Sequence, residues 1–206
     1  MDRYLDYWNL MCYDYAGSWD RTSGHAANLY ASPDKPETTP FNTDQAVSAY
    51  LRVGIPAHKI IIGMPLYGRA FGETQGPGTS FTSIPAGHYE PGVYDYKDLP
   101  LSNRSVIQED SKLGASWSYD SAQRVMVSFD TQSIVNLKAK YIRKKGLGGG
   151  VFWEASGDGS RENSLIFAFL SAIGGKQVLQ QSPNHILYPD SKYENIRSVP
   201  SSLEDL

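Results

Sequence analysis

The sequence of 206 residues predicts an α/β fold. Short apolar runs rich in β-branched and aromatic residues alternate with segments of helical periodicity. Their order is strand, helix, strand, inserted segment, helix, strand, helix. Strands that alternate with helices in this way usually form a parallel sheet covered by the helices. The pattern therefore predicts a parallel sheet or part of a (β/α)₈ barrel.

The first strand and helix precede a second strand that completes the first unit. Residues 7–13 are apolar and aromatic, which is typical of a buried strand, and a polar loop rich in Gly, Ser and Pro follows from Asp14. Thr43 is the expected N-cap of a helix that ends at Gly54. The β-branched run 59–64 then predicts a strand buried on both faces, parallel to the first.

The next segment, 67–130, has a different pattern. Gly and Pro recur, and short aromatic runs at 114–119 and 124–129 alternate with polar residues. Such runs predict antiparallel strands. The stretch is too long for a plain loop, so we expect a small inserted domain.

Helical periodicity returns at Thr131, and the helix should end at Gly146 after three basic residues in its last turn. A strand at 148–153 and a helix from about 162 to 173 follow. The polar, Pro-containing tail is expected to be irregular. The chain thus divides into four parts: a barrel segment at 1–66, the insertion at 67–130, a barrel segment at 131–175 and the tail at 176–206.

Composition excludes several classes of function. A net charge of −3 argues against a nucleic-acid or anionic-membrane partner, and no apolar run approaches the roughly 20 residues of a membrane span. Aromatic and acidic residues follow Met1 at once, so no signal peptide is predicted. The single cysteine, Cys12, excludes an internal disulfide. The four histidines show no ligand spacing, so we expect neither a metal nor another cofactor: His25, His58, His88 and His185.

The aromatic composition is unusual, with 14 Tyr against 7 Phe, plus 4 Trp. Tyr and Trp combine a flat apolar face with a hydrogen-bonding edge. A sugar-binding cleft uses both properties, whereas a core rich in aromatic residues uses only the first. The composition alone is compatible with either interpretation.

Three groups of side chains follow the expected parallel strands. In a barrel, the C-terminal strand ends carry the functional face. Each group contains an aromatic residue and a charged residue, as a binding site would. Each is also compatible with a purely structural role, in which the ring fills the end of the barrel and the charge faces solvent. The groups are Met11, Tyr13, Asp14 and Trp19; Met64, Tyr67 and Arg69; and Trp153, Glu154 and Asp158.

These segments resemble the barrel strands of family 18 glycoside hydrolases, the chitinases. Residues 7–15, Tyr-Trp-Asn-Leu-Met-Cys-Tyr-Asp-Tyr, resemble the sixth strand; residues 62–69, Ile-Gly-Met-Pro-Leu-Tyr-Gly-Arg, the seventh; and residues 149–158 the eighth. The segment between the last two is similar to the α+β insertion of the longer chitinases, and residues 188–197 resemble the end of fungal members. The resemblance implies a partial (β/α)₈ TIM barrel with an α+β insertion.

The resemblance also implies an activity and a set of site residues. Such enzymes hydrolyse β-1,4-linked N-acetylglucosamine polymers by a substrate-assisted retaining mechanism, and chitin or its oligosaccharides would be the partner. Tyr13 and Asp14 match catalytic positions of the family. The residues that match substrate-binding positions are Met11, Trp19, Tyr67, Arg69 and Trp153. An extracellular location is implied as well.

One family motif is absent from the sequence. The general acid belongs to Asp-x-x-Asp-x-Asp-x-Glu on the fourth strand, and the nearest start, at Asp95 and Asp98, continues with Pro100 and Ser102. We therefore expect the C-terminal part of a chitinase, with the N-terminal part of the barrel as a further partner and little hydrolysis by this chain alone. Two alternatives stay open. One is a non-hydrolytic chitin-binding lectin. The other is a different barrel glycosidase with Asp14 and Glu154 as its carboxylate pair, retaining at about 5 Å separation and inverting if wider.

Overall fold

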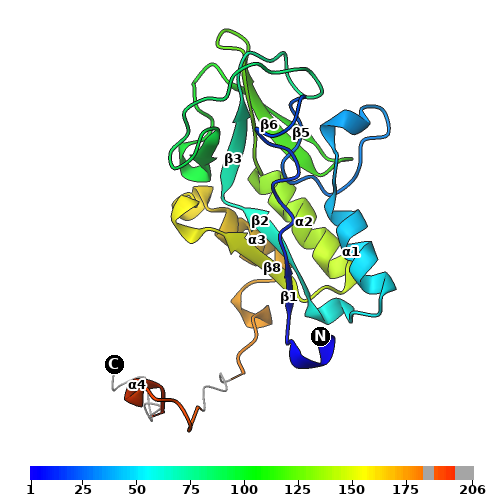
Figure 1. The fold of residues 1–206 in the computed structure, drawn as a ribbon, viewed down its shortest axis with the longest axis vertical. Helices are drawn as coiled ribbons and strands as arrows, with labels where there is room; N and C mark the ends of the chain where they lie inside the picture. The colour runs from blue at the N-terminus through cyan, green and yellow to red at the C-terminus, as the bar shows by residue number, and fades with distance from the viewer. Residues whose placement is uncertain (183–187, 198–206) are drawn as a thin grey trace. The chain divides into compact units, whose positions relative to one another are not determined.

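The computed structural model describes residues 1–182 and 188–197. The chain forms two compact units, Met1–Lys176 and Gln177–Leu206. The first unit contains two β-sheets and three α-helices (Figure 1). The chain is therefore a mixed α/β protein, as the sequence predicts.

A parallel sheet forms one half of the first unit. Its strands are β1 (Trp8–Leu10), β2 (Ile60–Pro65) and β8 (Gly149–Trp153), in the order β1-β2-β8. Leu10 lies opposite Ile62, and Gly63 lies opposite Val151. The expected parallel pairing is confirmed. Among the described residues, β1 and β8 each pair with β2 alone.

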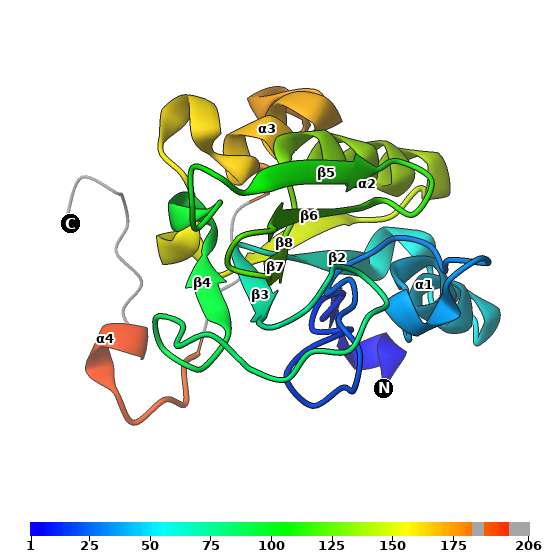
Figure 2. The same cartoon turned by 90° about the horizontal axis from the view of Figure 1, so that it is seen from above.

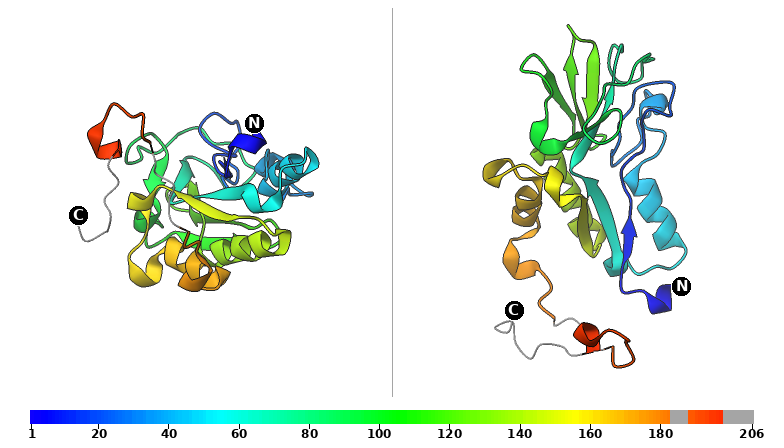
Figure 3. Two further views of the ribbon diagram at one scale, coloured as in Figure 1. Left: turned by 90° about the horizontal axis from the view of Figure 1, so that it is seen from below. Right: turned by 60° about the vertical axis from the view of Figure 1, so that its left-hand side comes forward.

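Three helices pack against this sheet: α1 (Thr43–Arg52), α2 (Gln132–Lys145) and α3 (Leu165–Ile173). Figures 2 and 3 show α2 and α3 side by side. Side chains from β2 and from all three helices form one apolar core. Its fully buried members include Val47, Ile60, Ile62, Met64, Val135, Ala139 and Leu165.

The helix ends correct two expectations. Asn42, and not Thr43, caps α1, because the Asn42 side chain accepts a 2.9 Å hydrogen bond from the Gln45 amide. The buried Thr43 hydroxyl lies 3.2 Å from the Asn28 carbonyl oxygen instead. Likewise α3 begins at Leu165, three residues later than expected, because Ser164 caps it.

The α2 boundaries agree with the sequence. The Thr131 hydroxyl accepts from the Ile134 amide, and Gly146 ends the helix in the left-handed conformation at φ 65°. Glycine adopts this conformation without the steric penalty of a Cβ. The last turn carries the three basic residues, where they complement the helix dipole.

An antiparallel sheet forms the other half of the first unit, with the order β4-β3-β7-β6-β5. The strands at 114–119 and 124–129 are confirmed as β6 and β7, which pair antiparallel. The five strands are β3 (Tyr67–Phe71), β4 (Val93–Asp95), β5 (Val106–Asp110), β6 (Ala115–Asp120) and β7 (Val125–Ser128).

The two sheets are joined directly. Only Leu66 separates the end of β2 from the start of β3, so the central strand of the parallel sheet leads straight into the antiparallel one (Figure 1). A buried ion pair holds the segment that follows β7 against α2: Lys138 Nζ lies 2.5 Å from Asp130 Oδ2, and both side chains are fully buried. Side chains that begin β3 are thereby fixed relative to β2.

Short helices complete the chain. The tail, expected to be irregular, contains the four-residue helix α4 (Glu194–Arg197), whereas Pro183, His185 and Pro200 lie outside the described residues. None of the described helices combines the length and apolar character needed to cross a bilayer. The 3-10 helices are Asp2–Tyr4, Pro36–Thr38, Ala57–Lys59, Tyr96–Asp98, Ala155–Gly157, Arg161–Asn163 and Lys176–Val178.

Candidate functional site

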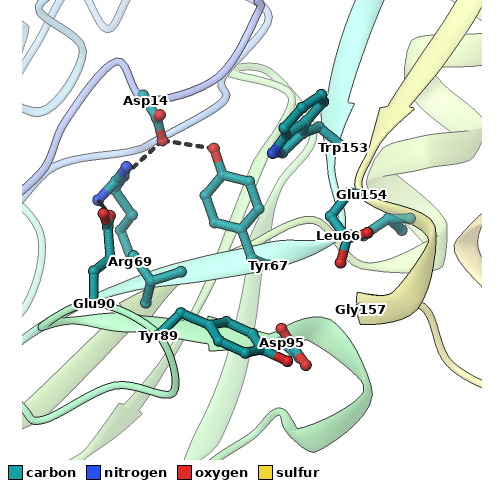
Figure 4. A pocket seen from close by; sticks show the side chains of 11 residues that line it. Asp14, Leu66, Tyr67, Arg69, Tyr89, Glu90, Asp95, Trp153, Glu154 and Gly157 are labelled. Atoms are coloured by element: carbon teal, nitrogen blue, oxygen red, sulfur yellow. Dashed lines mark hydrogen bonds and ion pairs between the residues drawn. The ribbon is translucent and has the colours of Figure 1, made fainter.

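A pocket of about 340 Å³ lies at the C-terminal ends of the parallel strands. Parallel strands end at one edge of a sheet, so the residues that follow them meet there. The chain contributes Asp14 after β1, Tyr67 and Arg69 from β3, and Trp153 from the end of β8 (Figure 4). The remaining lining residues are Leu66, Tyr89, Glu90, Val93, Asp95, Glu154 and Gly157.

Asp14 is the centre of the polar network in this pocket. Its Oδ1 accepts a 2.7 Å hydrogen bond from the Tyr67 hydroxyl and a 2.6 Å bond from Arg69 Nε (Figure 4). Asp14 itself has φ 59°, a left-handed conformation that Asp tolerates better than most residues. The chain therefore turns at Asp14, after β1 has ended at Leu10, and directs this carboxylate toward β3.

Arg69 connects two carboxylates. Its Nη1 lies 3.0 Å from Glu90 Oε1, while Nε is bonded to Asp14. Burial alone would lower the pKa of Arg69, but the hydrogen bond and charge of Asp14 outweigh burial, and the pKa is raised. The guanidinium also lies 4.8 Å from the ring centroid of Trp19, a cation–π distance. Arg69 is thus a fixed positive charge in the wall of the pocket.

Two tyrosines lie beside Asp14. Burial and the hydrogen bond to Asp14 raise the pKa of Tyr67, and burial and the charge of Asp14 raise the pKa of Tyr13. Both therefore stay neutral hydroxyl donors near neutral pH. Their rings contact edge to face at 6.1 Å. A Cβ on Gly63 would come within 2.7 Å of the Tyr13 ring, so glycine at this position of β2 makes room for Tyr13.

The expected site residues are only partly brought together. Asp14, Tyr67, Arg69 and Trp153 share the pocket, and Trp153 is 62% exposed. Tyr13 and Trp19 contact this group through Tyr67 and Arg69, but they do not line the pocket. Met11 is largely exposed and does not line it either.

The acids that follow Trp153 have local roles. The Glu154 carboxylate accepts from the amide and the hydroxyl of Ser156, so it caps a 3-10 helix. Asp158 accepts from the Leu165 amide at 2.8 Å and from the Ser164 hydroxyl, at the start of α3. In the part of the chain that the structure describes, Asp14 and Glu154 share no hydrogen-bond partner.

Sequence reasoning missed Tyr89 and Glu90. Both come from the segment between β3 and β4 and line the pocket, where Glu90 is the second partner of Arg69. They directly precede the Pro91-Gly92 turn. An aromatic residue and an acid beside a tight turn were the available indication, since turns place such side chains at a surface.

One group of potential metal ligands occurs among the described residues. His88 Nδ1 lies 3.8 Å from both Asp95 Oδ2 and Asp98 Oδ2. The Lys97 ammonium lies 3.1 Å from Asp95 Oδ2 and already provides a positive charge there. The group is accounted for as an ion-pair network, and the expected absence of a metal or cofactor stays a prediction.

Comparisons with known proteins bear on this site. Residues 1–158 match the profile of glycosyl hydrolases family 18. Chitinase 1 of Aphanocladium album is 45% identical over 197 residues, which are 96% of this chain and 46% of that protein. The chain thus spans about half the length of this curated relative.

Solved structures show the same likeness. A chitinase of Bacillus thuringiensis superimposes with a TM-score of 0.75 at 29% identity, over 88% of this chain and 33% of that one. A plant class V chitinase mutant from Cycas revoluta, in complex with (GlcNAc)3, superimposes with a TM-score of 0.71 over 84% of this chain and 48% of that one. At 24% identity the second structure indicates the fold alone.

Proposed function

Because the chain belongs to family 18 of the glycosyl hydrolases, we propose that it forms the substrate-holding part of an extracellular chitinase. Its parallel sheet then corresponds to the last three strands of a (β/α)₈ barrel, with residues 67–130 as the α+β insertion. The ligand is a β-1,4-linked N-acetylglucosamine chain. Membership of this family removes the interpretation of Asp14 and Glu154 as the carboxylate pair of a glycosidase from another family.

The observation that carries the proposal is the bonded group of Asp14, Tyr67 and Arg69 beside the exposed indole of Trp153. The indole offers a flat apolar face for one side of a pyranose ring. A carboxylate has about four acceptor positions, so Asp14 can accept a sugar N–H or O–H in addition to its two protein donors. Because those donors hold the carboxylate in place, binding costs little side-chain entropy.

The proposed mechanism uses the substrate as its own nucleophile. The acetamido oxygen attacks the anomeric carbon while the glycosidic C–O bond breaks and a general acid protonates the leaving oxygen. Water then opens the resulting oxazolinium ion, so the anomeric configuration is retained overall. The neutral Tyr13 hydroxyl hydrogen-bonds and orients that oxygen, and Asp14 holds the sugar next to the cleaved bond. Orientation of this kind supplies a proximity effect.

A general acid must come from elsewhere in the barrel. The 206 residues contain no Asp-x-x-Asp-x-Asp-x-Glu, and a positioned acid contributes roughly 10² to 10⁴ in rate. The chain alone therefore binds oligosaccharides and hydrolyses them little. The partner that restores activity is the N-terminal part of the barrel.

The test is a titration of the pure chain with N-acetylglucosamine oligomers, followed by intrinsic Trp fluorescence and by analysis of the products. We expect saturable binding that Trp153→Ala abolishes. Phe41→Ala is the matched control, because Phe41 is also 62% exposed and does not line the pocket. An equal effect of both variants, or no binding at all, would contradict the proposal.

A lectin-like binding protein is the second candidate, favoured by the missing acid motif. Both candidates predict binding without cleavage by this chain alone. They differ when the acid-bearing part of a relative's barrel is added, since only a chitinase part should then regain cleavage. Rapid cleavage by the pure chain, abolished by Tyr13→Phe, would contradict both.

A further inference from the structure

A second cavity, of about 290 Å³, lies away from the strand ends. The long loop between β1 and α1 forms one wall, and the β5–β6 hairpin of the insertion forms the other. It shares no lining residue with the pocket around Asp14. It is therefore a separate feature that the proposed function does not use.

The walls of this cavity are fixed to one another by backbone hydrogen bonds. The Tyr30 amide donates to the Leu113 carbonyl at 2.9 Å, and the Leu29 amide donates to the Gly114 carbonyl at 3.3 Å. On another side the Gly78 amide donates to the Ser23 carbonyl at 2.8 Å. The cavity is thus bounded by segments held in register and is not a gap between loose loops.

An aromatic pair lies in the inner part of the cavity. His25 is only 2% exposed, and its ring lies 5.1 Å from the ring of Trp117. Burial lowers the pKa of His25 to about 4, so the imidazole is neutral near neutral pH. Its Nδ1 has no hydrogen-bond partner among the described residues. One wall of the cavity therefore combines the Trp117 indole with a neutral, buried imidazole.

The polar lining indicates what kind of ligand would fit. Asp110 uses Oδ1 to accept from the Lys112 and Leu113 amides, which leaves Oδ2 for a ligand. The lining carries two carboxylates, Asp34 and Asp110, against one ammonium, Lys35, so it disfavours an anionic ligand. Carboxylates and hydroxyls around an indole match a neutral ring with one apolar face and many hydroxyl groups.

We propose that this cavity is a second saccharide-binding site, which takes one pyranose unit against Trp117 with its hydroxyl groups toward Asp34 and Asp110. The site does not depend on the cleft, because its ligand class follows from its own lining. It would give the protein a second point of contact with a carbohydrate surface. Two linked contacts on one polymer raise the overall affinity above that of either contact.

The experiment is a titration of the ¹⁵N-labelled chain with N-acetylglucosamine and its trisaccharide, observed by NMR at the four indole N–H groups. We expect the Trp117 signal and the Gly114 amide to shift, and Asp34→Ala to weaken this binding about tenfold, as for loss of a hydrogen bond to a charged group. Glu37→Ala is the matched control. It lies on the same loop and is exposed, but it does not line the cavity.

A Trp153→Ala background separates the two sites. The second site is supported if the Trp117 signal still shifts in the Trp153→Ala variant and no longer shifts when Asp34→Ala is added. In the native chain, shifts confined to Trp19 and Trp153 would overturn the second site and leave the proposal for the Asp14 pocket intact. Shifts confined to Trp117 would support the second site and contradict binding at the Asp14 pocket. A Trp117 signal that moves with inorganic phosphate but not with saccharide would overturn the ligand class. Equal effects of Asp34→Ala and Glu37→Ala would overturn the location.

Discussion

Asp14 illustrates how much one side chain can determine in this protein. The carboxylate is placed by its own left-handed backbone and held by two donors from β3. Neither donor is close in sequence, since they are 53 and 55 residues away. The pocket exists because a strand end and the start of another strand meet at this carboxylate.

Removal of one hydrogen-bond donor to Asp14 should therefore lower the stability of the fold measurably. Tyr67→Phe keeps the ring contact with Tyr13 but loses the 2.7 Å bond to Asp14. We expect the free energy of unfolding to fall by about 1–2 kcal/mol in urea titrations. Tyr89→Phe, on an exposed residue, should change it by less than about 0.5 kcal/mol. Equal losses would show that the bond to Asp14 contributes nothing.

A pH effect should arise from His25. Burial lowers its pKa from 6.5 to about 4, and the nearby charge of Asp110 offsets only part of that shift. Between those values the unfolded chain binds the proton and the folded chain does not, so stability falls as the pH is lowered through this range. We expect a contribution of about 2 kcal/mol to be lost between pH 7 and pH 5.

His25→Gln should remove this pH dependence in denaturant titrations at the two pH values. His58→Gln, on an exposed histidine, should leave it unchanged. A dependence that survives in His25→Gln would assign it to other groups.

Sequence reasoning located part of the pocket for a physical reason. Asp14, Tyr67 and Trp153 follow apolar runs, and strand ends meet at one edge. Glu90 could not be found in this way, because its contact with Arg69 depends on the path of the loop between β3 and β4. The capping role of Glu154 depends on local turn geometry, which strand positions do not indicate.

Helices and strands also differ in whether local sequence or distant contacts determine them. Helix α2 was predictable at both ends because a Thr cap, a basic last turn and Gly146 are all local features. Strand β3 was not, since Tyr-Gly-Arg-Ala-Phe lacks a clear alternation and its pairing comes from β4 and β7. Strand β5 lies at the exposed edge of the antiparallel sheet. Because its side chains are not buried, its sequence shows no apolar pattern.

The buried ion pair between Asp130, which follows β7, and Lys138 of α2 should be a major source of stability. Lys138→Met leaves Asp130 buried without its partner, and such a loss costs about 3–5 kcal/mol. The double variant Lys138→Met with Asp130→Leu should recover most of the loss, because an apolar pair needs no desolvation of charge. Lys140→Met on the same helix, where the side chain is exposed, is the control. Unfolding in guanidinium chloride gives the free energy of unfolding of all three variants. A double variant no more stable than Lys138→Met would contradict this explanation.

The molecule as a whole leaves the parallel sheet open. Among the described residues β1 and β8 have no second neighbour, and the chain spans about half the length of a relative it matches. The sequence predicted the α/β class and the parallel pairing, because β-branched runs that alternate with helices are typical of buried parallel strands. It could not indicate how the two sheet edges are covered, since edge pairing does not depend on local sequence pattern.

Exposed edge strands pair with other chains, and a charge on the edge prevents such pairing. We expect the chain to self-associate with rising concentration in sedimentation velocity, and Val151→Lys on β8 to reduce this association. Val53→Lys, also an exposed valine but off the sheet, should not reduce it. Co-expression with the N-terminal part of a relative's barrel should replace self-association by a one-to-one complex. A chain that stays monomeric at every concentration, with amides of β1 and β8 protected from hydrogen exchange, would mean that these edges need no partner and that the barrel proposal fails.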